Sequence, residues 1–167
     1  MRVVSPLEMK SIEKKSYEDY GLSESLIIEN VGIRSADFLR SKLKSHNSEI
    51  IFLIGKGNNA ADGLSTARHL MTQKYSVRAL MLFPGEKYGQ NLLDQIRLCE
   101  AFGVKINEIS NAEALSSYFF QVGSDVVAVD ALMGTGFRPP LSNYLFDIIQ
   151  LCNQHCTQIF SLDISSG

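Results

Sequence analysis

The segment Gly55-Lys-Gly-Asn-Asn-Ala-Ala-Asp-Gly63 follows directly on the apolar run Glu49-Ile-Ile-Phe-Leu-Ile54. A buried strand that ends in glycines and asparagines, with a helical segment after it, is typical of a nucleotide-binding βα turn. The glycines allow a tight turn and a close approach to a ligand. Backbone N–H groups at the start of the helix can donate to phosphate oxygens. The segment therefore predicts an α/β fold with an anion-binding turn.

Strand-like and helix-like segments alternate along the chain from this turn onward. Nearly continuous apolar runs indicate strands that are covered on both faces, and regular alternation with helices predicts a parallel sheet with right-handed crossovers. We expect strands at residues 50–54, 77–83, 104–108, 125–130 and 158–162, and helices at residues 63–73, 90–102, 111–118 and 143–153. The expected fold is a Rossmann-like, three-layer α/β/α domain with a mainly parallel sheet.

Two further helices are expected before the first strand. Ser5-Pro-Leu-Glu8 is a capping-box pattern with proline at the first helical position, and this helix should run to about Tyr20 and end at Gly21. A second helix should begin near Ser23, with Gly32 weakening its middle. These helices must pack on the sheet or on a partner.

Composition limits the classes of protein that fit. A chain of 167 residues with 45% apolar content is expected to form one domain with a buried core. The net charge of −2 and the pI of about 5.9 give no electrostatic reason for binding nucleic acid or membranes. No apolar run approaches the roughly 20 residues of a membrane span, and no signal-peptide pattern follows Met1. Three cysteines without a disulfide framework favour a reducing cytoplasm.

The chain stops at Gly167, directly after its last expected strand, and no crossover helix follows to cover that strand. We therefore expect residues 1–167 to be one domain that is truncated at its C-terminal end. Cys152 and Cys156 lack the second cluster that a zinc site needs, and His69 has no evident carboxylate partner, so we interpret all three as structural.

Three polar clusters follow the ends of expected strands, at residues 58–62, 130–138 and 163–167. Ligands of parallel α/β sheets bind beyond the carboxyl ends of the strands, so these clusters should converge on one site. A classical dinucleotide fingerprint is one interpretation, because Gly55-x-Gly57-x-x-Ala60 fits G-x-G-x-x-G/A. The second strand, however, lacks a ribose-binding acidic residue at its end, since Glu86 comes only after the turn. Hydride transfer is therefore disfavoured.

Four segments, in order along the chain, resemble motifs of the YjeF N-terminal domain family, the NAD(P)HX epimerases. Residues 55–63 resemble G-x-G-N-N-G-G-D-G, and Ile28-Glu-Asn-Val-Gly32 resembles the M-E-N-A-G helix. Asp130-Ala-Leu-Met-Gly-Thr-Gly-Phe137 resembles D-A-L-F-G-T-G, and Ser161-Leu-Asp-Ile-Ser-Ser-Gly167 resembles D-I-P-S-G. The four motifs cover almost the whole chain, and their order makes the resemblance more specific than any single motif. The family's domain normally extends further, which agrees with the expected truncation.

The resemblance implies a repair activity on NADH and NADPH that have taken up water at C6 of the nicotinamide ring. Family members interconvert the R and S hydrates, and an ADP- or ATP-dependent dehydratase, often fused C-terminally in bacteria, acts on the S form. They also bind one potassium ion per subunit. The implied partners are thus the hydrated dinucleotide and a fused or separate dehydratase, and the sequence leaves open whether the domain forms a homodimer.

The resemblance also assigns site residues. Asn59, Asp130 and Ser166 would hold potassium, a hard cation that prefers oxygen ligands. The dinucleotide would contact Asp163 and two segments, consisting of Asn58, Asn59, Ala60, Ala61 and Asp62, and of Gly134, Thr135, Gly136, Phe137, Arg138, Pro139 and Pro140.

Epimerisation at C6 requires either breaking and remaking a C–O bond or opening and reclosing the ring. Both routes place positive charge on the ring nitrogen and move protons, which an aspartate at a strand end can assist. We predict that Asp163 is the catalytic acid or base; the alternative is that it only hydrogen-bonds the ligand. For Asp62 the plainer alternative to ligand binding is capping of the following helix.

Two departures from the family motifs affect this prediction. Ala60-Ala61 replaces Gly-Gly, and Ser165 replaces a proline. An alanine forced to positive φ would cost about 1–2 kcal/mol, whereas in a right-handed helix start it is harmless. The alternative function is therefore a catalytically inert domain that binds nucleotides or serves as a protein scaffold. Retention of the potassium ligands and Asp163 favours the enzyme.

Overall fold

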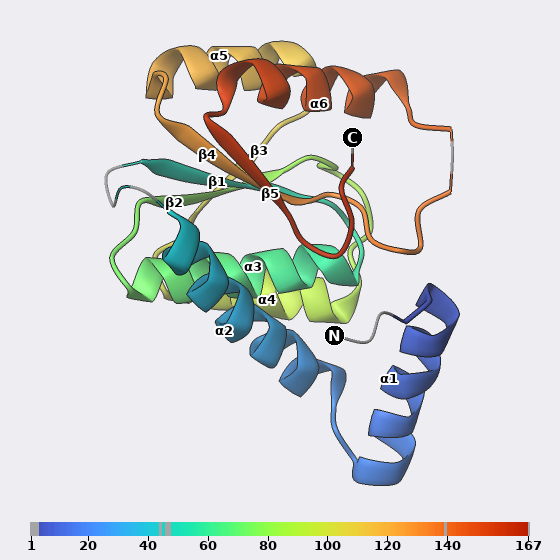
Figure 1. Ribbon diagram of the computed structural model, residues 1–167. Coiled ribbons are helices and arrows are strands. Elements are labelled where there is room, and N and C mark those ends of the chain that lie inside the picture. Colours follow the sequence, from blue (N-terminus) through green and yellow to red (C-terminus); the bar gives the residue numbers. More distant parts are fainter. Residues whose placement is uncertain (1–3, 44, 46–47, 139, 167) are drawn as a thin grey trace.

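The central element of the fold is β1 (Glu49–Ile54), the apolar run before the glycine-rich turn. A computed structural model describes residues 4–43, 45, 48–138 and 140–166 (Figure 1). Two N-terminal helices precede a regular alternation of strands and helices, as the sequence predicts. The other elements are α1 (Pro6–Tyr20), α2 (Glu24–Lys42), α3 (Asn58–Thr72), β2 (Val77–Met81), α4 (Gln90–Ala101), β3 (Lys105–Glu108), α5 (Ala112–Val122), β4 (Val126–Ala131), α6 (Asn143–His155) and β5 (Gln158–Ser161).

The five strands pair in parallel in the order β3-β2-β1-β4-β5. β1 lies between β2 and β4, so Ile54 is level with Met81 on one side and with Ala131 on the other. The chain moves outward from β1 through β2 to β3 and then crosses back to β4. Strand order therefore reverses beside β1, and open α/β sheets bind ligands at such a reversal, beyond the carboxyl ends of the strands.

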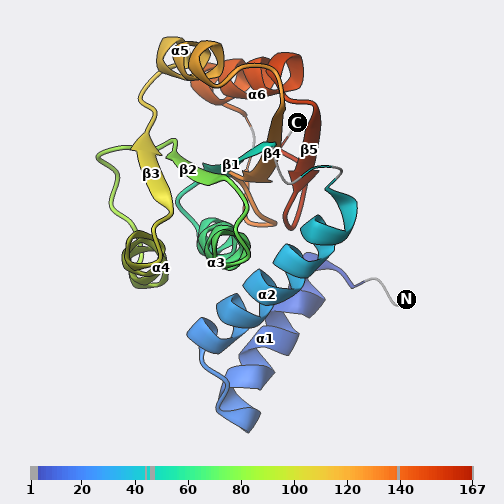
Figure 2. The same ribbon diagram turned by 90° about the vertical axis from the view of Figure 1, so that its left-hand side faces the viewer.

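Helices cover both faces of the sheet (Figures 1 and 2). α3 and α4 lie on one face, with α2 packed against α3, and α5 and α6 lie on the other. β1 contributes to the apolar core on each face, because Phe52 and Ile54 point to one side and Leu53 to the other. The predicted three-layer α/β/α fold with a parallel sheet is therefore confirmed.

The start of α3 differs from the prediction, since the helix begins at Asn58 rather than at residue 63. Gly57 is the N-cap, with an extended backbone, and two alanines, which are good helix formers, continue the helix from the asparagines. Gly63 thus lies inside α3 and against β4. A Cβ atom on Gly63 would be only 2.6 Å from the Cβ of Ala131, so glycine permits this close packing of helix on strand.

Other boundaries shift because of tertiary packing. α5 continues past residue 118 to Val122, since Phe119 is buried in the core between α5, α6 and the sheet. Burial of this aromatic residue outweighs its weak helix propensity. α6 likewise ends at His155 rather than at residue 153, and β2 ends at Met81 rather than at residue 83.

α2 fits closely on α3 at one glycine and one ion cluster. A Cβ on Gly32 would lie 2.0 Å from the Oγ of Ser65, so the two helices touch here. One turn earlier, the Glu29 carboxylate pairs with the guanidinium of Arg68 and lies 2.7 Å from Nε2 of His69. The expectation that His69 lacks a carboxylate partner is therefore wrong, because its partner comes from a helix 40 residues away in sequence.

α1 is a capped helix with an exposed apolar surface. The Ser5 hydroxyl accepts the N–H of Glu8 at 3.3 Å, the Glu8 carboxylate accepts the N–H of Ser5 at 2.8 Å, and Gly21 ends the helix at φ +67°. The predicted capping box and helix end are thus confirmed. Leu7 and Tyr20 are largely exposed. Across the described residues, no helix is both long enough and apolar enough to cross a membrane.

Candidate functional site

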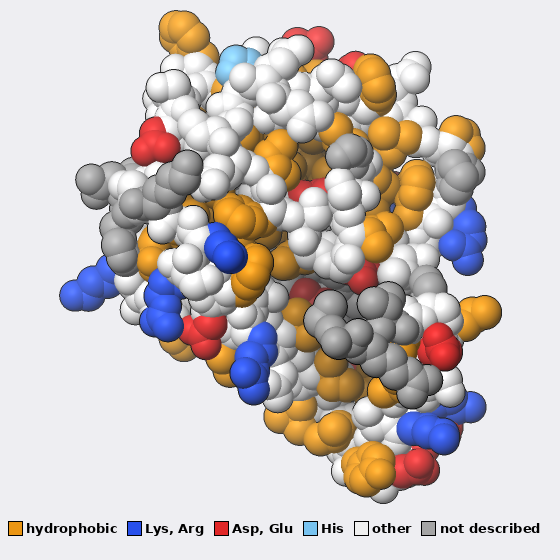
Figure 3. All heavy atoms as spheres, in the orientation of Figure 1, with side chains coloured by type: hydrophobic (Ala, Val, Ile, Leu, Met, Phe, Trp, Pro, Cys, Tyr) orange, Lys and Arg blue, Asp and Glu red, His pale blue; other side chains and the backbone are white. Residues whose placement is uncertain are grey.

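The carboxyl ends of β1, β4 and β5 bring the three polar clusters to one edge of the sheet (Figure 1). α3 starts just after β1, the loop before α6 leaves β4, and the last described residues follow β5. The space-filling view in the same orientation shows a hollow on this side of the molecule, with acidic side chains on its floor and apolar side chains around it (Figure 3). The expected convergence of the clusters is therefore present.

Asp130, at the end of β4, is buried and accepts four hydrogen bonds. Its Oδ1 accepts the hydroxyl of Ser166 at 2.7 Å and the N–H of Leu132 at 3.1 Å. Its Oδ2 accepts the N–H of Ser166 at 2.9 Å and the hydroxyl of Ser161 at 3.1 Å. One carboxylate thus fixes the loop after β5 against the end of β4, and it brings together two of the three predicted potassium ligands.

Asn59, the third predicted ligand, lies in the first turn of α3 and is 8% exposed. Its Nδ2 donates to the carbonyl of Met133 at 2.8 Å and to the carbonyl of Leu162 at 3.3 Å. These two acceptors fix the orientation of the amide, because only the nitrogen can donate. Its Oδ1 is buried and has no hydrogen-bond partner among the described residues. A buried acceptor without a donor is unusual in proteins and suits a bound cation.

Asp163 has a left-handed backbone with φ +63°, which is uncommon outside glycine. Its side chain is exposed, and Oδ2 accepts the N–H of Thr135 at 2.8 Å. Gly134 separates Asp163 from Asn59: a Cβ there would lie 2.7 Å from Asp163 Oδ2 and 3.4 Å from Asn59 Cβ. The small size of Gly134 thus keeps the carboxylate of Asp163 close to the buried amide.

Asp62 lies in the second turn of α3 and is partly buried. The suggestion that it caps the helix is wrong, since α3 begins at Asn58 and its N-cap is Gly57. Burial, the charge of Asp163 and the charge of Glu13 on α1, in that order, raise the pKa of Asp62 to about 7. Asp62 therefore carries a proton on a large fraction of molecules at neutral pH.

The alanine pair that replaces Gly-Gly is buried in the first turn of α3 with right-handed backbone. Ala60 and Ala61 therefore carry no left-handed strain, and the backbone cost considered for this substitution does not arise. Asn58, by contrast, is exposed at the start of the helix. Gly57 provides no side chain to cap α3, and the N–H of Ala60 donates to the Gly57 carbonyl at 3.1 Å. The backbone N–H groups of Asn58 and Asn59, which have no partner among the described residues, suit an anion.

The loop after β4 places the other predicted ligand-binding residues beside the site. Gly134 accepts the N–H of Phe137 at 3.0 Å in a turn, and the Phe137 ring packs on the core formed with α5 and α6. Thr135, Gly136, Arg138 and Pro140 are exposed. The guanidinium of Arg138 donates to the carbonyl of Phe137 at 3.0 Å and so lies along its own loop. Pro139 lies outside the described residues.

Two neighbours of the site were not identified from sequence. The first is Glu13 on α1, whose negative charge contributes to the raised pKa of Asp62. On the same helix, burial and the charges of Glu24, Glu13 and Asp62 raise the pKa of Tyr17. Lys56, in the glycine-rich turn, pairs with Glu86 at 3.6 Å. Glu13 and Asp62 are too far apart in the sequence for any local pattern to connect them. Lys56 was identifiable, because a lysine between two glycines of an anion-binding turn indicates a phosphate contact.

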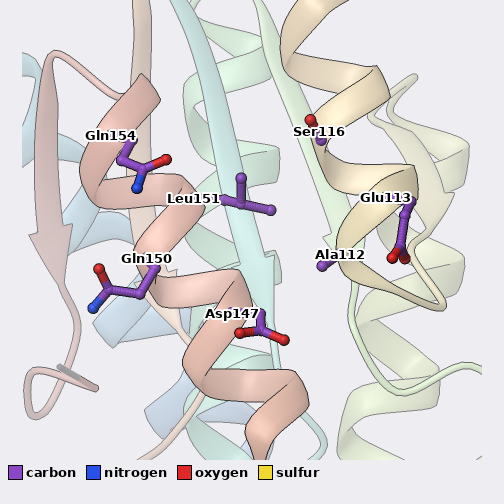
Figure 4. Close-up of a pocket in the computed structure, with 7 residues that line it drawn as sticks. All are labelled: Ala112, Glu113, Ser116, Asp147, Gln150, Leu151 and Gln154. Carbon is purple, nitrogen blue, oxygen red and sulfur yellow. The ribbon is translucent and has the colours of Figure 1, made fainter.

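A groove of about 340 Å³ lies elsewhere, between α5 and α6 (Figure 4). Its walls come from these two helices alone, and Leu151 projects between them. No residue from the ends of β1, β4 or β5 lines it, so it carries none of the predicted chemistry. Within the described part of the chain, no group of three or more His, Cys, Asp or Glu side chains has the arrangement of a metal site.

Comparison with known proteins links this arrangement to one family. The sequence model of the family described as YjeF-related protein N-terminus matches residues 24–167. The NAD(P)H-hydrate epimerase of Rhodopirellula baltica is 26% identical over 159 residues, which cover 95% of this chain and 63% of the relative. The bifunctional NAD(P)H-hydrate repair enzyme Nnr of Thermofilum pendens is 28% identical over 169 residues, which cover 100% of this chain and 32% of the relative.

The fold has a counterpart among known structures. The crystal structure of yeast ynu0 (YNL200c) superposes with a TM-score of 0.84 at 22% identity. The match covers 100% of this chain and 72% of the yeast chain. At this level of identity the likeness shows a shared fold.

Proposed function

Because this chain belongs to the family of YjeF-related protein N-termini, we propose that it interconverts the R and S hydrates of NADH and NADPH. The epimerase and repair-enzyme names of the relatives support the proposal, although the chain spans only 63% and 32% of their lengths. The observation that carries it is the buried Asn59 amide, whose Oδ1 has no hydrogen-bond partner among the described residues. Its Nδ2 donates to the Leu162 carbonyl in the segment after β5, which Asp130 at the end of β4 holds through Ser166.

The proposed dinucleotide site uses the start of α3 and the loop after β4. The pyrophosphate would accept the free N–H groups beyond Gly57, aided by the positive end of the helix. Lys56, which lies in the turn and pairs with Glu86 at 3.6 Å, would exchange this partner for a second phosphate contact. Exposed Asn58 and the loop of Gly134 to Pro140 would flank the ligand. In this proposal the nicotinamide ring faces Asp163.

We further propose that Asn59 Oδ1, Asp130 and Ser166 hold one potassium ion per subunit. The unpartnered amide oxygen fits a cation, and the Asp130 carboxylate and the Ser166 hydroxyl, which lie 2.7 Å apart, would complete a set of oxygen donors. When bound, the ion would supply a fixed positive charge that ties the loops after β4 and β5 to α3. Asp130→Asn removes the only formal negative charge of the set and should weaken this binding.

Thermal melting in potassium and in sodium chloride at equal ionic strength tests the ion site without any activity measurement. We expect a higher Tm for the wild type in potassium, because a ligand of the folded state raises its stability. In Asp130→Asn the difference between the two salts should disappear. Equal Tm values for the wild type across a wide range of potassium concentration would contradict the site.

The proposed role of Asp163 follows from the charge that develops during the reaction. Loss of the C6 oxygen leaves positive charge on the ring nitrogen, which a nearby carboxylate stabilises. The N–H of Thr135 donates to one oxygen of Asp163, and we propose that the other oxygen faces the ligand. Asp163 can then accept or return a proton at the substrate.

The direct experiment is chromatography of the separated R and S hydrates after incubation with the full-length protein in potassium buffer. We expect interconversion well above the spontaneous rate. Binding without any acceleration would instead support the inert nucleotide-binding or scaffold domain. The bifunctional relatives support a further proposal, that this activity works together with an ADP- or ATP-dependent dehydratase. The three free thiols support a cytoplasmic location.

A further inference from the structure

We infer that the carboxyl end of β2 binds the adenosine half of the substrate, where Glu86 accepts the 2′-hydroxyl of the ribose and selects the hydrate of NADH over that of NADPH. NADPH differs from NADH only by a phosphate on this hydroxyl. The inference rests on the proposed epimerase function and extends it, because it assigns the residue that decides between the two coenzyme forms.

The order of the strands places the two halves of the dinucleotide on opposite sides of β1. In the proposed site the pyrophosphate lies at the start of α3, directly after β1, and the nicotinamide ring faces Asp163 in the segment after β5. β4 and β5 lie on one side of β1, and β2 lies on the other (Figure 2). The adenosine half of an extended dinucleotide therefore falls at the end of β2, where α/β folds commonly bind the ribose through an acidic side chain.

A tight turn follows β2 and reverses the chain at this end of the sheet. β2 ends at Met81, and residues 83–86 form the turn. The N–H of Glu86 donates to the carbonyl of Phe83 at 3.2 Å, and Gly85 has φ +80°. A Pro-Gly pair at the two central positions, with positive φ at the glycine, is the pattern of a type II turn. The turn directs the chain back toward the end of β1.

Glu86 meets the glycine-rich turn through an ion pair. Its carboxylate lies 3.6 Å from the ammonium of Lys56, and both side chains are about half exposed. The same ammonium lies 5.3 Å from the centre of the Phe83 ring. Glu86 therefore lies beside the ends of β1 and β2 in space, although it comes only after the turn in the sequence. An exposed ion pair contributes little to stability, so a ligand can replace it.

The exchange proposed for Lys56 determines what Glu86 presents to the ribose. When the ammonium turns to a phosphate of the ligand, the Glu86 carboxylate loses its cation and keeps its acceptor oxygens. An ionised carboxylate can accept a hydroxyl proton but cannot donate one. The 2′-hydroxyl of the NADH hydrate supplies that donor. The 2′-phosphate of the NADPH hydrate is anionic and meets Glu86 as a like charge.

The neighbouring strand adds a second negative charge on this side. Glu108 is the last residue of β3 and is level with Met81 of β2. Burial, the charge of Glu108 and the charge of Glu86, in that order, raise the pKa of Tyr88, so both carboxylates act on the chain just after the turn. Lys87 is exposed, and it pairs with neither carboxylate in the part of the chain that the structure describes. This negative field disfavours a 2′-phosphate.

The test is calorimetry of the full-length protein with ADP-ribose and with its 2′-phosphate. These probes carry the adenosine half and the pyrophosphate but no nicotinamide ring, so they report on binding without any chemistry. We expect the wild type to bind ADP-ribose about tenfold more tightly or better. Glu86→Gln keeps the shape and one acceptor but removes the charge, and should reduce this preference to about threefold or less. Glu86→Lys should reverse it.

Three control variants separate Glu86 from other charges. Lys56→Met should weaken both probes by a similar factor, because both share the pyrophosphate, and should leave the preference unchanged. Lys87→Gln should leave the preference within about twofold of the wild type. Glu113→Gln removes one negative charge from α5, in the groove away from the site, and should change neither affinity.

An equal or tighter wild-type affinity for the 2′-phosphate would overturn the inference, as would no detectable binding of either probe. An unchanged preference in Glu86→Gln, or a loss confined to the 2′-phosphate in Lys56→Met or Lys87→Gln, would also overturn it. None of these results affects interconversion of the hydrates by the wild type, so the proposed function would stand. A wild type that prefers ADP-ribose but leaves both hydrates unconverted would overturn the proposed function alone, and Glu86 would remain the selective residue of a nucleotide-binding domain.

Discussion

The end of β4 and the second turn of α3 each place an aspartate at the same edge of the sheet, yet their surroundings are opposite. Asp130 accepts four hydrogen bonds and fixes the loop after β5. Asp62 has two acidic neighbours, and its pKa is raised to about 7. The comparison teaches that burial alone does not define what a carboxyl group does. Four donors make the Asp130 carboxylate a structural anchor, whereas burial and like charges raise the pKa of Asp62.

Asp130→Ala gives the largest expected effect on this comparison. It removes the acceptor for Ser161, Leu132 and both donors of Ser166 while leaving these groups partly buried. We expect a loss of about 3–5 kcal/mol in the free energy of unfolding, the range for breaking a buried charged network. Urea unfolding monitored by circular dichroism measures it. A loss under about 1 kcal/mol would show that the four hydrogen bonds do not anchor the loop.

Asp163→Asn tests the third aspartate at this edge of the sheet. The variant separates a role in proton transfer from a role in ligand binding. Asparagine keeps the shape and one acceptor but cannot cycle a proton at neutral pH. We expect the saturated epimerisation rate to fall by about 10²-fold, or ~2.7 kcal/mol, with little change in ligand affinity. Turnover and calorimetry on the same variant measure the two quantities. Weaker binding with a nearly normal saturated rate would limit Asp163 to anchoring the ligand.

Asp62→Asn should stabilise the protein in a pH-dependent way, opposite in sign to the effect at Asp130. The folded pKa of Asp62 is raised from 3.8 to about 7, so the stability contributed by its protonated form is fully present below pH 4 and is lost as pH rises through 7. Asparagine avoids this loss. We expect equal stability of variant and wild type near pH 4 and a gain on the order of 2 kcal/mol at pH 8, after discounting for partial exposure.

Unfolding of both proteins in urea between pH 4 and pH 8 provides this measurement. Asp94→Asn, on the exposed side of α4, is a suitable control, since its carboxylate lies near Arg97 and Gln90 rather than near the site. A gain at pH 8 that persists unchanged at pH 4 would mean that the Asp62 charge is not its cause.

Ala60→Gly has the smallest expected effect and tests the backbone that carries Asp62. Because Ala60 is right-handed in the first turn of α3, glycine should cost about 0.5–1 kcal/mol in stability. Thermal melting measures the change. Restoring the glycine of the family motif should therefore weaken the helix rather than relieve strain, and a rise in Tm would contradict the right-handed backbone.

Sequence reasoning located the strands and the convergence of Asn59, Asp130 and Ser166, because long apolar runs and parallel topology determine which ends meet. It placed the start of α3 five residues late, since paired asparagines are more typical of loops and only packing of Ala60 and Ala61 against the core shows that the helix already includes them. The influence of Glu13 on Asp62 was not predictable, because it depends on where α1 lies in space.

The left-handed backbone at Asp163 has a consequence for how such a domain can change over generations. A non-glycine residue at φ +63° costs folding energy, on the order of 1 kcal/mol, that glycine would not. Replacement of Asp163 by glycine is thus a substitution that selection for stability alone would favour. An aspartate at this position is maintained against that pressure only while its carboxylate is in use. Under the proposed function, descendants that no longer carry out the reaction should therefore lose Asp163 before they lose the hydrogen-bonded Asp130.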